Sequence, residues 1–468
     1  MRCLLINPAM DLARLGRVSG LLEPMPPTGL ASVAGSLAAA GEFVRVVDMF
    51  AEGLGGQEVL ERAVRFRPDV VGMSVMTPSA PVCAELSSRI RAAVPGVRIL
   101  WGGVHADVFG PEIVEAGHAD AVVHGDGERA AVEILAAWSE GRDLSGIRGV
   151  TWAQDGRAVL NEVRPPDPDL DTLPWPAWDL FPIHRYGLLP FADMAKPVLT
   201  LAASRGCPYR CAYCSLLHLH GKTYRRRDPV KVVDEYQWLL ERFGVRQVGF
   251  VDPIFPLHIE DLRSFCEEIL RRGLQERCVW LSETRADRLD PETCRLMYAS
   301  GCRRVLLGIE SGSVRLLENV NKRLDVEEVR NGVQNAREAG IQTVGLFMIG
   351  LPGETPVLTR QTVEFAVSLD LDFAKFAITV PFPGSALFHD AWQKTLFRDD
   401  WENYVTFNPD PDRLVYHPDG YDPAELIRMQ SWALRRFYAR PRQVRRQLFE
   451  LRTLTPRNVL NGLWGMVP

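Results

Sequence analysis

The chain has 468 residues, of which 46% are hydrophobic, and its formal net charge at pH 7 is −5. This composition is ordinary for a globular protein of about three domains, and so small a net charge does not indicate a general nucleic-acid surface. No apolar run reaches the roughly 18–20 residues of a membrane span, and the 9 cysteines, which form no disulfide-like framework, indicate a reducing, cytoplasmic setting.

The first third of the chain alternates short apolar runs with longer runs of helix-type composition. The run that begins at Cys3 is too short for a signal peptide and reads as a first strand. Such alternation predicts a parallel sheet with helices on both faces, and ligands of these sheets bind beyond the carboxyl ends of the strands. The expected strands are 3–6, 44–47, 70–75, 98–101 and 121–123, and the expected helices are 29–40, 57–65, 81–93, 110–116 and 128–139.

Small and polar residues follow the second, third and fourth of these strands. Glycines among them would let the backbone lie against a flat or bulky ligand. In order along the chain, the pattern resembles the cobalamin-binding domain, whose signature is D-x-H-x-x-G, then S-x-L, then G-G. The residues that carry this resemblance, and that it implies bind cobalamin, are Asp48, Phe50, Gly53, Ser74, Met76, Thr77, Gly102 and Gly103.

The sequence departs from that signature at Phe50, where the family has the histidine that is the lower axial cobalt ligand. Phenylalanine cannot ligate a metal, so we expect cobalt without a histidine ligand from this motif. The same absence resembles the subset of cobalamin domains fused to radical S-adenosylmethionine (radical SAM) domains, as do the segments 26–30 and 124–128. Through the latter, Gly125 and Glu128 join the predicted cobalamin-binding residues.

Two alternatives remain for this region. The fold could be a plain flavodoxin-like or nucleotide-binding domain. Asp48 and Glu128 could be simple acids at helix N-termini, which the helix dipole favours.

Residues 164–182 form a connector rich in proline and acidic residues. Proline removes backbone donors and prevents helix, so this segment is expected to be extended. Trp175, Trp178 and Phe181 are expected to pin the connector to a domain rather than to bind substrate.

Three cysteines, Cys207, Cys211 and Cys214, have the spacing C-x3-C-x2-C, with Tyr213 just before the third. Cysteine thiolates hold iron–sulfur clusters, and three ligands leave one iron of a cubane open. The run closely resembles the cluster loop of the radical SAM enzymes. The resemblance implies a 4Fe-4S cluster whose open iron is chelated by the amino and carboxylate groups of SAM near Tyr213, and one-electron cleavage of SAM to a 5′-deoxyadenosyl radical. The alternative is a zinc knuckle or a redox dithiol, for which His218 and His220 are close in sequence.

Strand–helix alternation resumes after residue 197. The expected strands 198–203, 247–251, 279–283, 304–308, 343–348 and 373–379 predict the partial (β/α)6 barrel of the radical SAM family, in which chemistry gathers at the strand carboxyl ends. Arg285 is the candidate for the SAM carboxylate, because guanidinium pairs with carboxylate in a fork. The alternative for Arg285 and Glu310 is a structural ion pair. The predicted SAM-binding residues are Tyr213, Asp252, Glu283, Arg285, Glu310, Ser311 and Ile349, with Asp252 near the amine, Glu310 or Ser311 at the ribose and Ile349 beside the adenine.

The alternation ends near residue 388. A helix is expected over 424–438, and a second begins at Pro441. A basic amphipathic tail of this kind can contact an anionic membrane surface, and the alternative is a helical cap on the barrel. Its arginines are Arg435, Arg436, Arg440, Arg442, Arg445, Arg446, Arg452 and Arg457.

Together these features predict an α/β protein with a Rossmann-like cobalamin-binding domain (1–145), a linker (146–195), a radical SAM partial barrel (196–388) and a mostly helical, capping or substrate-determining region (389–468). The resemblance implies a cobalamin-dependent radical SAM enzyme that methylates an unactivated carbon or phosphorus of a small-molecule or lipid-like metabolite, through methylcobalamin and the deoxyadenosyl radical. The expected partner is an electron donor such as flavodoxin or ferredoxin, and no nucleic acid. The alternatives are a non-methylating radical reaction with the same cofactors (ring formation, ring contraction or oxidation) and a non-catalytic cobalamin or redox sensor.

Overall fold

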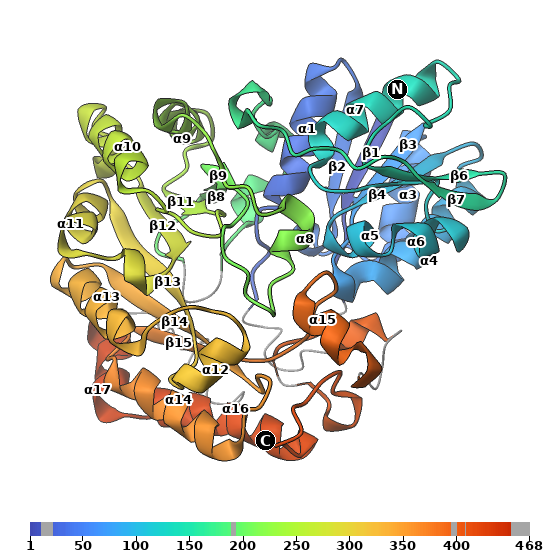
Figure 1. Cartoon of the computed structure of the whole chain (residues 1–468). Coiled ribbons are helices and arrows are strands. Elements are labelled where there is room, and N and C mark those ends of the chain that lie inside the picture. The colour runs from blue at the N-terminus through green and yellow to red at the C-terminus, as the bar shows by residue number, and fades with distance from the viewer. Residues whose placement is uncertain (11–21, 189–192, 395–399, 408, 451–468) are drawn as a thin grey trace.

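The computed structural model of the chain describes residues 1–10, 22–188, 193–394, 400–407 and 409–450. Two units built on parallel sheets lie beside each other, and the last helices run along the bottom of the second unit (Figure 1). Helix α8 (Leu216–His220) lies between the two units. The predicted α/β fold is confirmed.

The first unit has a seven-stranded sheet in the order β2-β1-β3-β4-β5-β6-β7, in which the first five strands are parallel. Side chains alternate between its two faces: Leu5 packs in the core beneath helices α1 and α7, whereas Leu4 and Ile6 pack in the core beneath α3 and α4. The strands are β1 (Arg2–Asn7), β2 (Phe43–Asp48), β3 (Val70–Ser74), β4 (Arg98–Gly102), β5 (Ala121–Val123), β6 (Val150–Gln154) and β7 (Arg157–Leu160). The helices are α1 (Thr28–Ala39), α2 (Met49–Glu52), α3 (Gly56–Phe66), α4 (Ala80–Ala93), α5 (Val104–Val108), α6 (Gly110–Glu115) and α7 (Gly127–Ser139).

The hairpin of β6 and β7 was not among the predicted strands. Its turn is Asp155-Gly156, with φ of 50° and 77°, the positive values that a tight two-residue hairpin turn requires. The sheet therefore extends past residue 145, and we propose that the first domain ends after β7.

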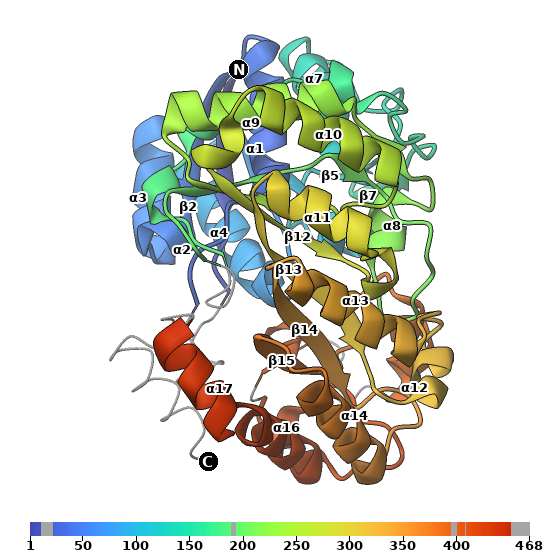
Figure 2. The same cartoon turned by 90° about the vertical axis from the view of Figure 1, so that its left-hand side faces the viewer.

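The second unit has a six-stranded parallel sheet in the order β15-β14-β13-β12-β11-β8, curved into a partial barrel. Helices α9, α10, α11 and α13 cover its outer face (Figure 2). The strands are β8 (Val198–Leu201), β11 (Gln247–Phe250), β12 (Val279–Thr284), β13 (Cys302–Glu310), β14 (Gln342–Ile349) and β15 (Phe373–Ile378), with a separate short pair, β9 (Ser204–Arg205) and β10 (Arg225–Arg226). The helices are α9 (Pro229–Phe243), α10 (Ile259–Arg271), α11 (Pro291–Ala299), α12 (Val314–Asn319), α13 (Val326–Glu338), α14 (Pro356–Ser368) and α15 (Ala386–Ala391).

An apolar cluster closes one end of the barrel lumen. We call it the lumen floor. It is formed by the inward side chains of five strands together with Leu188 of the connector, and its buried members are Leu188, Val198, Leu281, Leu306, Val344 and Phe373.

The connector packs tightly on the first unit. Trp178 and Phe181 are buried, which confirms that they pin it. Trp175 is 40% exposed but its ring lies 5.1 Å from that of Trp238, in the helix that covers the second unit. The backbone N–H of Ala177 donates to Ala31 O of α1 (3.0 Å). At Gly35 of the same helix, a Cβ atom would stand 2.2 Å from the carbonyl oxygen of Trp175, so only glycine allows this approach.

Helices α16 (Pro423–Tyr438) and α17 (Pro441–Arg445) cap the barrel beside β15 (Figure 2). Their arginines contact the barrel: Arg436 pairs with Glu364 (2.7 Å), and Arg442 pairs with Asp370 (2.6 Å). Arg446 donates to the carbonyls of Asp370 and Leu371. Arg452 and Arg457 lie outside the described residues. Among the helices of the described chain, none has the length and apolar character needed to cross a membrane.

Candidate functional site

A pocket of about 560 Å³ lies between the two units, where the strand ends of the first sheet meet the segment that follows β8. Six predicted cobalamin-site residues line it: Ser74, Met76, Gly102, Gly103, Gly125 and Glu128. From the second unit the pocket receives Ser204, Arg205, Tyr213, Cys214, Ser215 and His220. The fold thus brings six of the ten predicted cobalamin residues to one cavity with Tyr213 and Cys214 of the predicted cluster loop.

The wall of this pocket on the first unit suits a flat ligand. At Gly29 and Gly102 a Cβ atom would meet nothing within 4 Å, so both glycines leave open space beside the backbone. Gly103 has a φ of 96°, and a Cβ there would stand 2.8 Å from Val75 O. Beside them Met76 is 55% exposed, which is unusual for so apolar a side chain. Backbone without Cβ atoms next to an exposed thioether fits the face of a corrin ring.

The Asp48–Gly53 segment lies elsewhere, at the end of the edge strand β2. Asp48 is buried and accepts hydrogen bonds from Ala51 N (3.0 Å), from Asn7 Nδ2 (3.0 Å) and from the Tyr186 hydroxyl (2.9 Å). Burial raises the pKa of its carboxyl group. Asp48 is therefore a helix cap and an anchor for the connector, as the helix-acid alternative expected. The described residues that line the pocket do not include Asp48, Phe50, Gly53 or Thr77.

The three cysteines of the predicted cluster loop are partly exposed free thiols, whereas the other six cysteines are buried. Burial, and then repulsion from the thiolates of Cys211 and Cys207, raises the pKa of Cys214 to about 11. Before the loop, Gly206 has a φ of 84°, and a Cβ there would lie 2.3 Å from the carbonyl oxygen of Thr223. This tight turn, together with three neighbouring soft sulfur donors, fits an iron–sulfur cluster.

The zinc alternative finds no support in the arrangement of the histidines. Within the described residues, no three His, Cys, Asp or Glu side chains converge on one ion position. A cluster does not need such convergence, because each cysteine binds a different iron. His218 lies 3.3 Å from Asp107 Oδ2, and His220 lies 3.0 Å from Asp126 Oδ1, so both contact acids of the first unit.

Tyr213 joins the cluster loop to the barrel lumen. Its hydroxyl donates to Glu310 Oε1 (2.7 Å), and Lys322 Nζ donates to the same oxygen (2.8 Å). Glu310 Oε1 and Lys322 Nζ both lie close to Gly308, where a Cβ atom would stand 2.9 Å from each of these two atoms. Glu310 has a φ of 65°, a conformation that non-glycine residues adopt rarely and mostly near functional sites. The sequence reasoning missed Lys322, although its place in a polar run directly after α12 was a signal.

Arg285 does not face an open site. It forms a two-pronged pair with Asp287 and donates to the carbonyl oxygens of Lys322 (3.0 Å) and Arg323 (2.6 Å). Its guanidinium also stacks on the Tyr209 ring at 4.0 Å. The structural ion-pair alternative therefore describes Arg285 well, with Asp287 rather than Glu310 as its partner.

The remaining predicted SAM residues also have partners within the protein. Asp252 accepts from Ala203 N (3.0 Å) and from the Ser204 hydroxyl, and it holds the turn that leads to the cluster loop; burial raises its pKa to about 6. Ser311 shares a hydrogen bond with Thr362 (2.9 Å). Ile349 is fully buried in the core. Glu283 differs from these residues, because its side chain is exposed within the barrel.

An ion cluster that the sequence reasoning missed links the units beside the pocket. Arg205 pairs with Glu128 and Asp126, and Arg225 pairs with Asp126 at 2.6 Å. Burial alone would raise the pKa of Asp126, but His220, Arg205 and Arg225 together lower it. Arg225 is buried, so the basic run 221–227 contributes to the interface between the domains.

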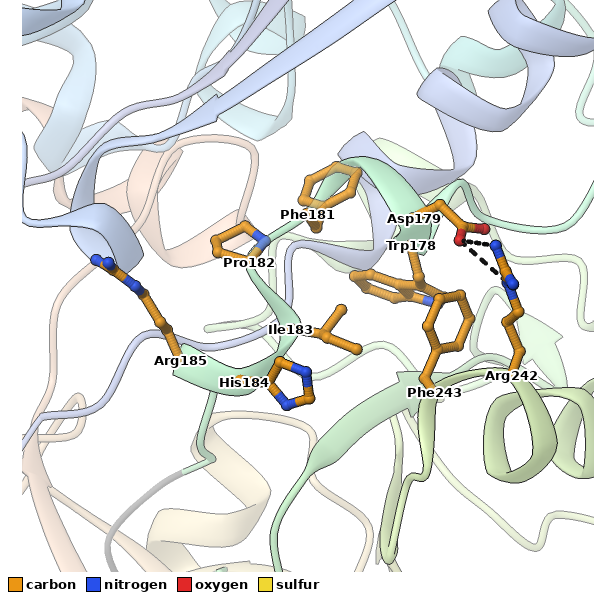
Figure 3. A pocket seen from close by; sticks show the side chains of 9 residues that line it. All are labelled: Trp178, Asp179, Phe181, Pro182, Ile183, His184, Arg185, Arg242 and Phe243. Atoms are coloured by element: carbon orange, nitrogen blue, oxygen red, sulfur yellow. Dashed lines mark hydrogen bonds and ion pairs between the residues drawn. The ribbon is translucent and has the colours of Figure 1, made fainter.

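A second hollow of about 540 Å³ lies where the connector crosses the end of α9 (Figure 3). Trp178, Phe181 and Phe243 form much of its wall, and Asp179 pairs with Arg242 at 2.7 Å. None of the predicted cluster, SAM or cobalamin residues lines it in the described chain. The pocket between the units is therefore the candidate functional site.

Comparisons with known proteins agree with this geometry. Residues 201–366 match the family model of the radical SAM superfamily, and residues 18–135 match that of the B12 binding domain. The chain is 31% identical to an uncharacterized methyltransferase of Pyrococcus horikoshii, over 99% of this chain and 98% of the relative. It is 32% identical to the anaerobic magnesium-protoporphyrin IX monomethyl ester cyclase of Rubrivivax gelatinosus, over 88% of this chain and 74% of that enzyme.

Among solved structures, the fold matches the radical S-adenosylmethionine methyltransferase TsrM from Kitasatospora setae, a structure with cobalamin and a [4Fe-4S] cluster bound. The TM-score is 0.72, with 20% sequence identity, over 98% of this chain and 89% of that one.

Proposed function

The chain belongs to the radical SAM enzymes that carry a cobalamin-binding domain, and we propose that it transfers a methyl group to an unactivated carbon or phosphorus of a small molecule. Its relative in Pyrococcus horikoshii, which matches over nearly the whole length, is named a methyltransferase. An electron-poor carbon is a poor nucleophile, so ordinary transfer from SAM fails and radical chemistry is needed.

One observation carries this proposal: the glycine wall of the first domain and the cluster loop of the second line the same pocket. When bound there, the cluster with SAM supplies a carbon-centred radical and cobalamin supplies the methyl group, while the protein provides binding and orientation. The residues of the chain fix the geometry. Arg205 and Glu128 hold the two walls together, and Asp252 holds the turn before the cluster loop.

We propose the following residue assignments for the cofactors. Cys207, Cys211 and Cys214 ligate the cluster. Tyr213, Glu310 and Lys322 face SAM, with Ile349 behind the adenine, whereas Asp252, Arg285 and Ser311 act as positioning residues. The cobalamin site is formed by Ser74, Met76, Gly102, Gly103, Gly125 and Glu128.

We also propose where the electron donor binds. Next to the cluster loop, Arg288 donates to the Tyr209 hydroxyl (2.7 Å), and Asn321 connects Arg210 to Arg323 through hydrogen bonds. The side chains of Arg210, Arg288 and Arg323 are exposed, and we call this group the cluster-side arginines. An acidic carrier such as flavodoxin or ferredoxin would be attracted to this surface. Three arginines of the C-terminal tail, Arg436, Arg442 and Arg446, contact the barrel, so we propose that this tail caps the barrel rather than binds lipid.

A second candidate function has its own support. The relative with 32% identity is named a cyclase. A cyclase-type reaction of this chain would use the same cofactors without a net methyl transfer. The test is anaerobic reconstitution with iron, sulfide and cobalamin, followed by SAM and a strong reductant. We expect both 5′-deoxyadenosine and S-adenosylhomocysteine. Deoxyadenosine alone would favour the cyclase-type reaction, and neither product, with an intact cluster, would favour a sensor.

A further inference from the structure

Two charged side chains point into the barrel lumen just above its floor. Leu281 of β12 and Phe373 of β15 belong to the lumen floor. Side chains along a strand repeat every two residues, so Glu283 and Lys375 point the same way, one step closer to the open end of the barrel.

Neither charge is paired. In the described chain, no hydrogen bond or ion pair is formed by the carboxylate of Glu283, whose backbone carbonyl accepts from Phe255 N (2.9 Å). The ammonium of Lys375 likewise has no acidic partner and lies 5.1 Å from the ring centroid of Phe407. The neighbouring charges in the same lumen behave differently, because Glu310 and Lys322 pair at 2.8 Å. Two opposite charges that face one lumen without a protein partner, yet remain reachable from solvent, are available to a polar ligand.

The electrostatic environment agrees with this view. The side chain of Glu283 is accessible to water although protein encloses it, and burial, reinforced by the charge of Glu310, raises its pKa to about 7. Burial lowers the pKa of Lys375. The charge of Lys375 lowers the pKa of Glu283 somewhat, and the charge of Glu283 raises that of Lys375, although no ion pair joins the two side chains. Titratable groups with shifted pKa values that face one another inside a fold are typical of binding and catalytic sites.

We propose that Glu283 and Lys375 bind the substrate, and that this substrate is a small molecule with an anionic oxygen group for Lys375 and an N–H or O–H donor for Glu283. The inference rests on the proposed methyl transfer and narrows its substrate class. A carboxylate, phosphate or phosphonate would satisfy Lys375, and the apolar part of the molecule would lie on the lumen floor. A neutral polycyclic lipid has no anionic group for Lys375 and would leave its charge without a partner. This proposal assigns Glu283, which the sequence analysis predicts to bind SAM, to the substrate instead.

The first experiment identifies the class of the acceptor. The reconstituted full-length enzyme is incubated with SAM labelled in its methyl group, reductant and a cell extract divided into an anion-exchange-retained fraction, an unretained polar fraction and a lipid fraction. We expect label in the retained fraction. In Glu283→Gln and Lys375→Met this labelling should fall at least about tenfold, as loss of one charged hydrogen bond predicts. Lys231→Met, on the outer helix α9, is the matched control and should label normally.

Three further readouts separate the explanations. Label in the lipid or unretained fraction overturns the proposal. Weaker binding of SAM itself by the two variants, measured by equilibrium dialysis, also overturns it, because the residues would then belong to the SAM site. Inorganic phosphate should raise the Tm of the wild type more than that of Lys375→Met, and equal shifts would contradict the anion site even if no fraction is labelled. If the wild type forms no S-adenosylhomocysteine, methyl transfer itself fails, while the phosphate titration still tests the lumen site.

Discussion

Arg205 of β9 forms an ion pair with Glu128 at the start of α7, with Nη1 3.2 Å from Oε2. The two residues come from different domains, and Arg205 lies two positions before Cys207. The side chain of Glu128 is only 4% exposed. The pair therefore fixes the cluster loop against the cobalamin domain at the edge of their shared pocket.

The first prediction concerns this pair. Glu128→Gln should lower the free energy of unfolding by on the order of 1–3 kcal/mol, less than a fully isolated buried charge would cost, because Asp126 still faces Arg205. Methyl transfer should fall more than SAM cleavage, since the pair sets the spacing of the two domains. The measurement is the ratio of methylated product to deoxyadenosine. Glu133→Gln, on the same helix and paired with Arg164, is the control. An equal loss of both products would assign the pair a purely structural role.

The second prediction separates cluster ligands from structural cysteines. Alanine at Cys207, Cys211 or Cys214 should abolish the iron–sulfur absorbance and both SAM products. Cys83→Ala is the control, because Cys83 is buried in the first domain and burial raises the pKa of its thiol to about 12, so it does not supply a thiolate. Full iron content in any of the three loop variants would refute its assignment.

The third prediction compares two adjacent glycines. Gly103→Ala should cost on the order of 1–3 kcal/mol of stability, because its backbone conformation suits only glycine and a Cβ would clash with Val75. The methyl group of Gly102→Ala would enter open space, so this variant without cobalamin should be at least as stable as the wild type without cobalamin. Its affinity for cobalamin should nevertheless fall by about tenfold or more, since the methyl group occupies the ligand's space. Dialysis followed by cobalamin absorbance measures this, and unchanged affinity would remove Gly102 from the site.

The fourth prediction concerns His105, which packs against Phe109 and Trp401. Burial lowers the pKa of its imidazole from 6.5 to about 4, so between these values the unfolded chain binds a proton that the folded chain does not. The contribution of His105 to the free energy of unfolding is therefore fully present above pH 6.5 and is lost as the pH falls toward 4, by at most about 3 kcal/mol. His105→Phe should remove this part of the decline in denaturant titrations at several pH values. An identical pH profile in the variant would show that His105 does not titrate in this range.

The fifth prediction tests the cluster-side arginines. Arg210→Glu combined with Arg323→Glu should slow cluster reduction by flavodoxin about tenfold or more at low ionic strength, because the steering charge is reversed. Reduction by dithionite should be unaffected, and added salt should slow the wild-type reaction with flavodoxin. Lys231→Glu, a charge reversal on the outer helix α9, serves as the control. Equal slowing with both reductants would indicate damage to the cluster rather than a docking surface.

Much of the fold could be predicted from the sequence, because its signals are local. Apolar periodicity marked the strands of both parallel sheets, and the cysteine spacing marked the cluster loop. The β6–β7 hairpin has a local signal as well, the Asp155-Gly156 pair, because this dipeptide favours a two-residue hairpin turn. A helix cap at Asp48 was among the alternatives, but the hydrogen-bond partners of Asp48 in the connector and of Lys322 in the barrel could not be predicted in this way. These partners are Tyr186 and Glu310, which are distant in the sequence and become neighbours only when the chain folds.

The burial of Arg225 and Arg285 could not be predicted for the same reason. Both are charged and would be expected at the surface or at a ligand, yet both are buried. Arg225 has its acidic partner in another domain, and Arg285 has carbonyl partners beyond α12. Only tertiary structure reveals such partners, and only they decide whether a buried arginine is available to a substrate.

The connector has a consequence for how the whole chain folds. One continuous apolar core contains Leu5 of the first sheet, Trp178 of the connector, Leu199 of the barrel and Phe437 of the C-terminal cap. Excising either domain would expose part of that core to water, so unfolding should be a single cooperative event rather than two separate transitions. The two cofactor-binding halves are thus not interchangeable modules, because each supplies part of the surface on which the other packs.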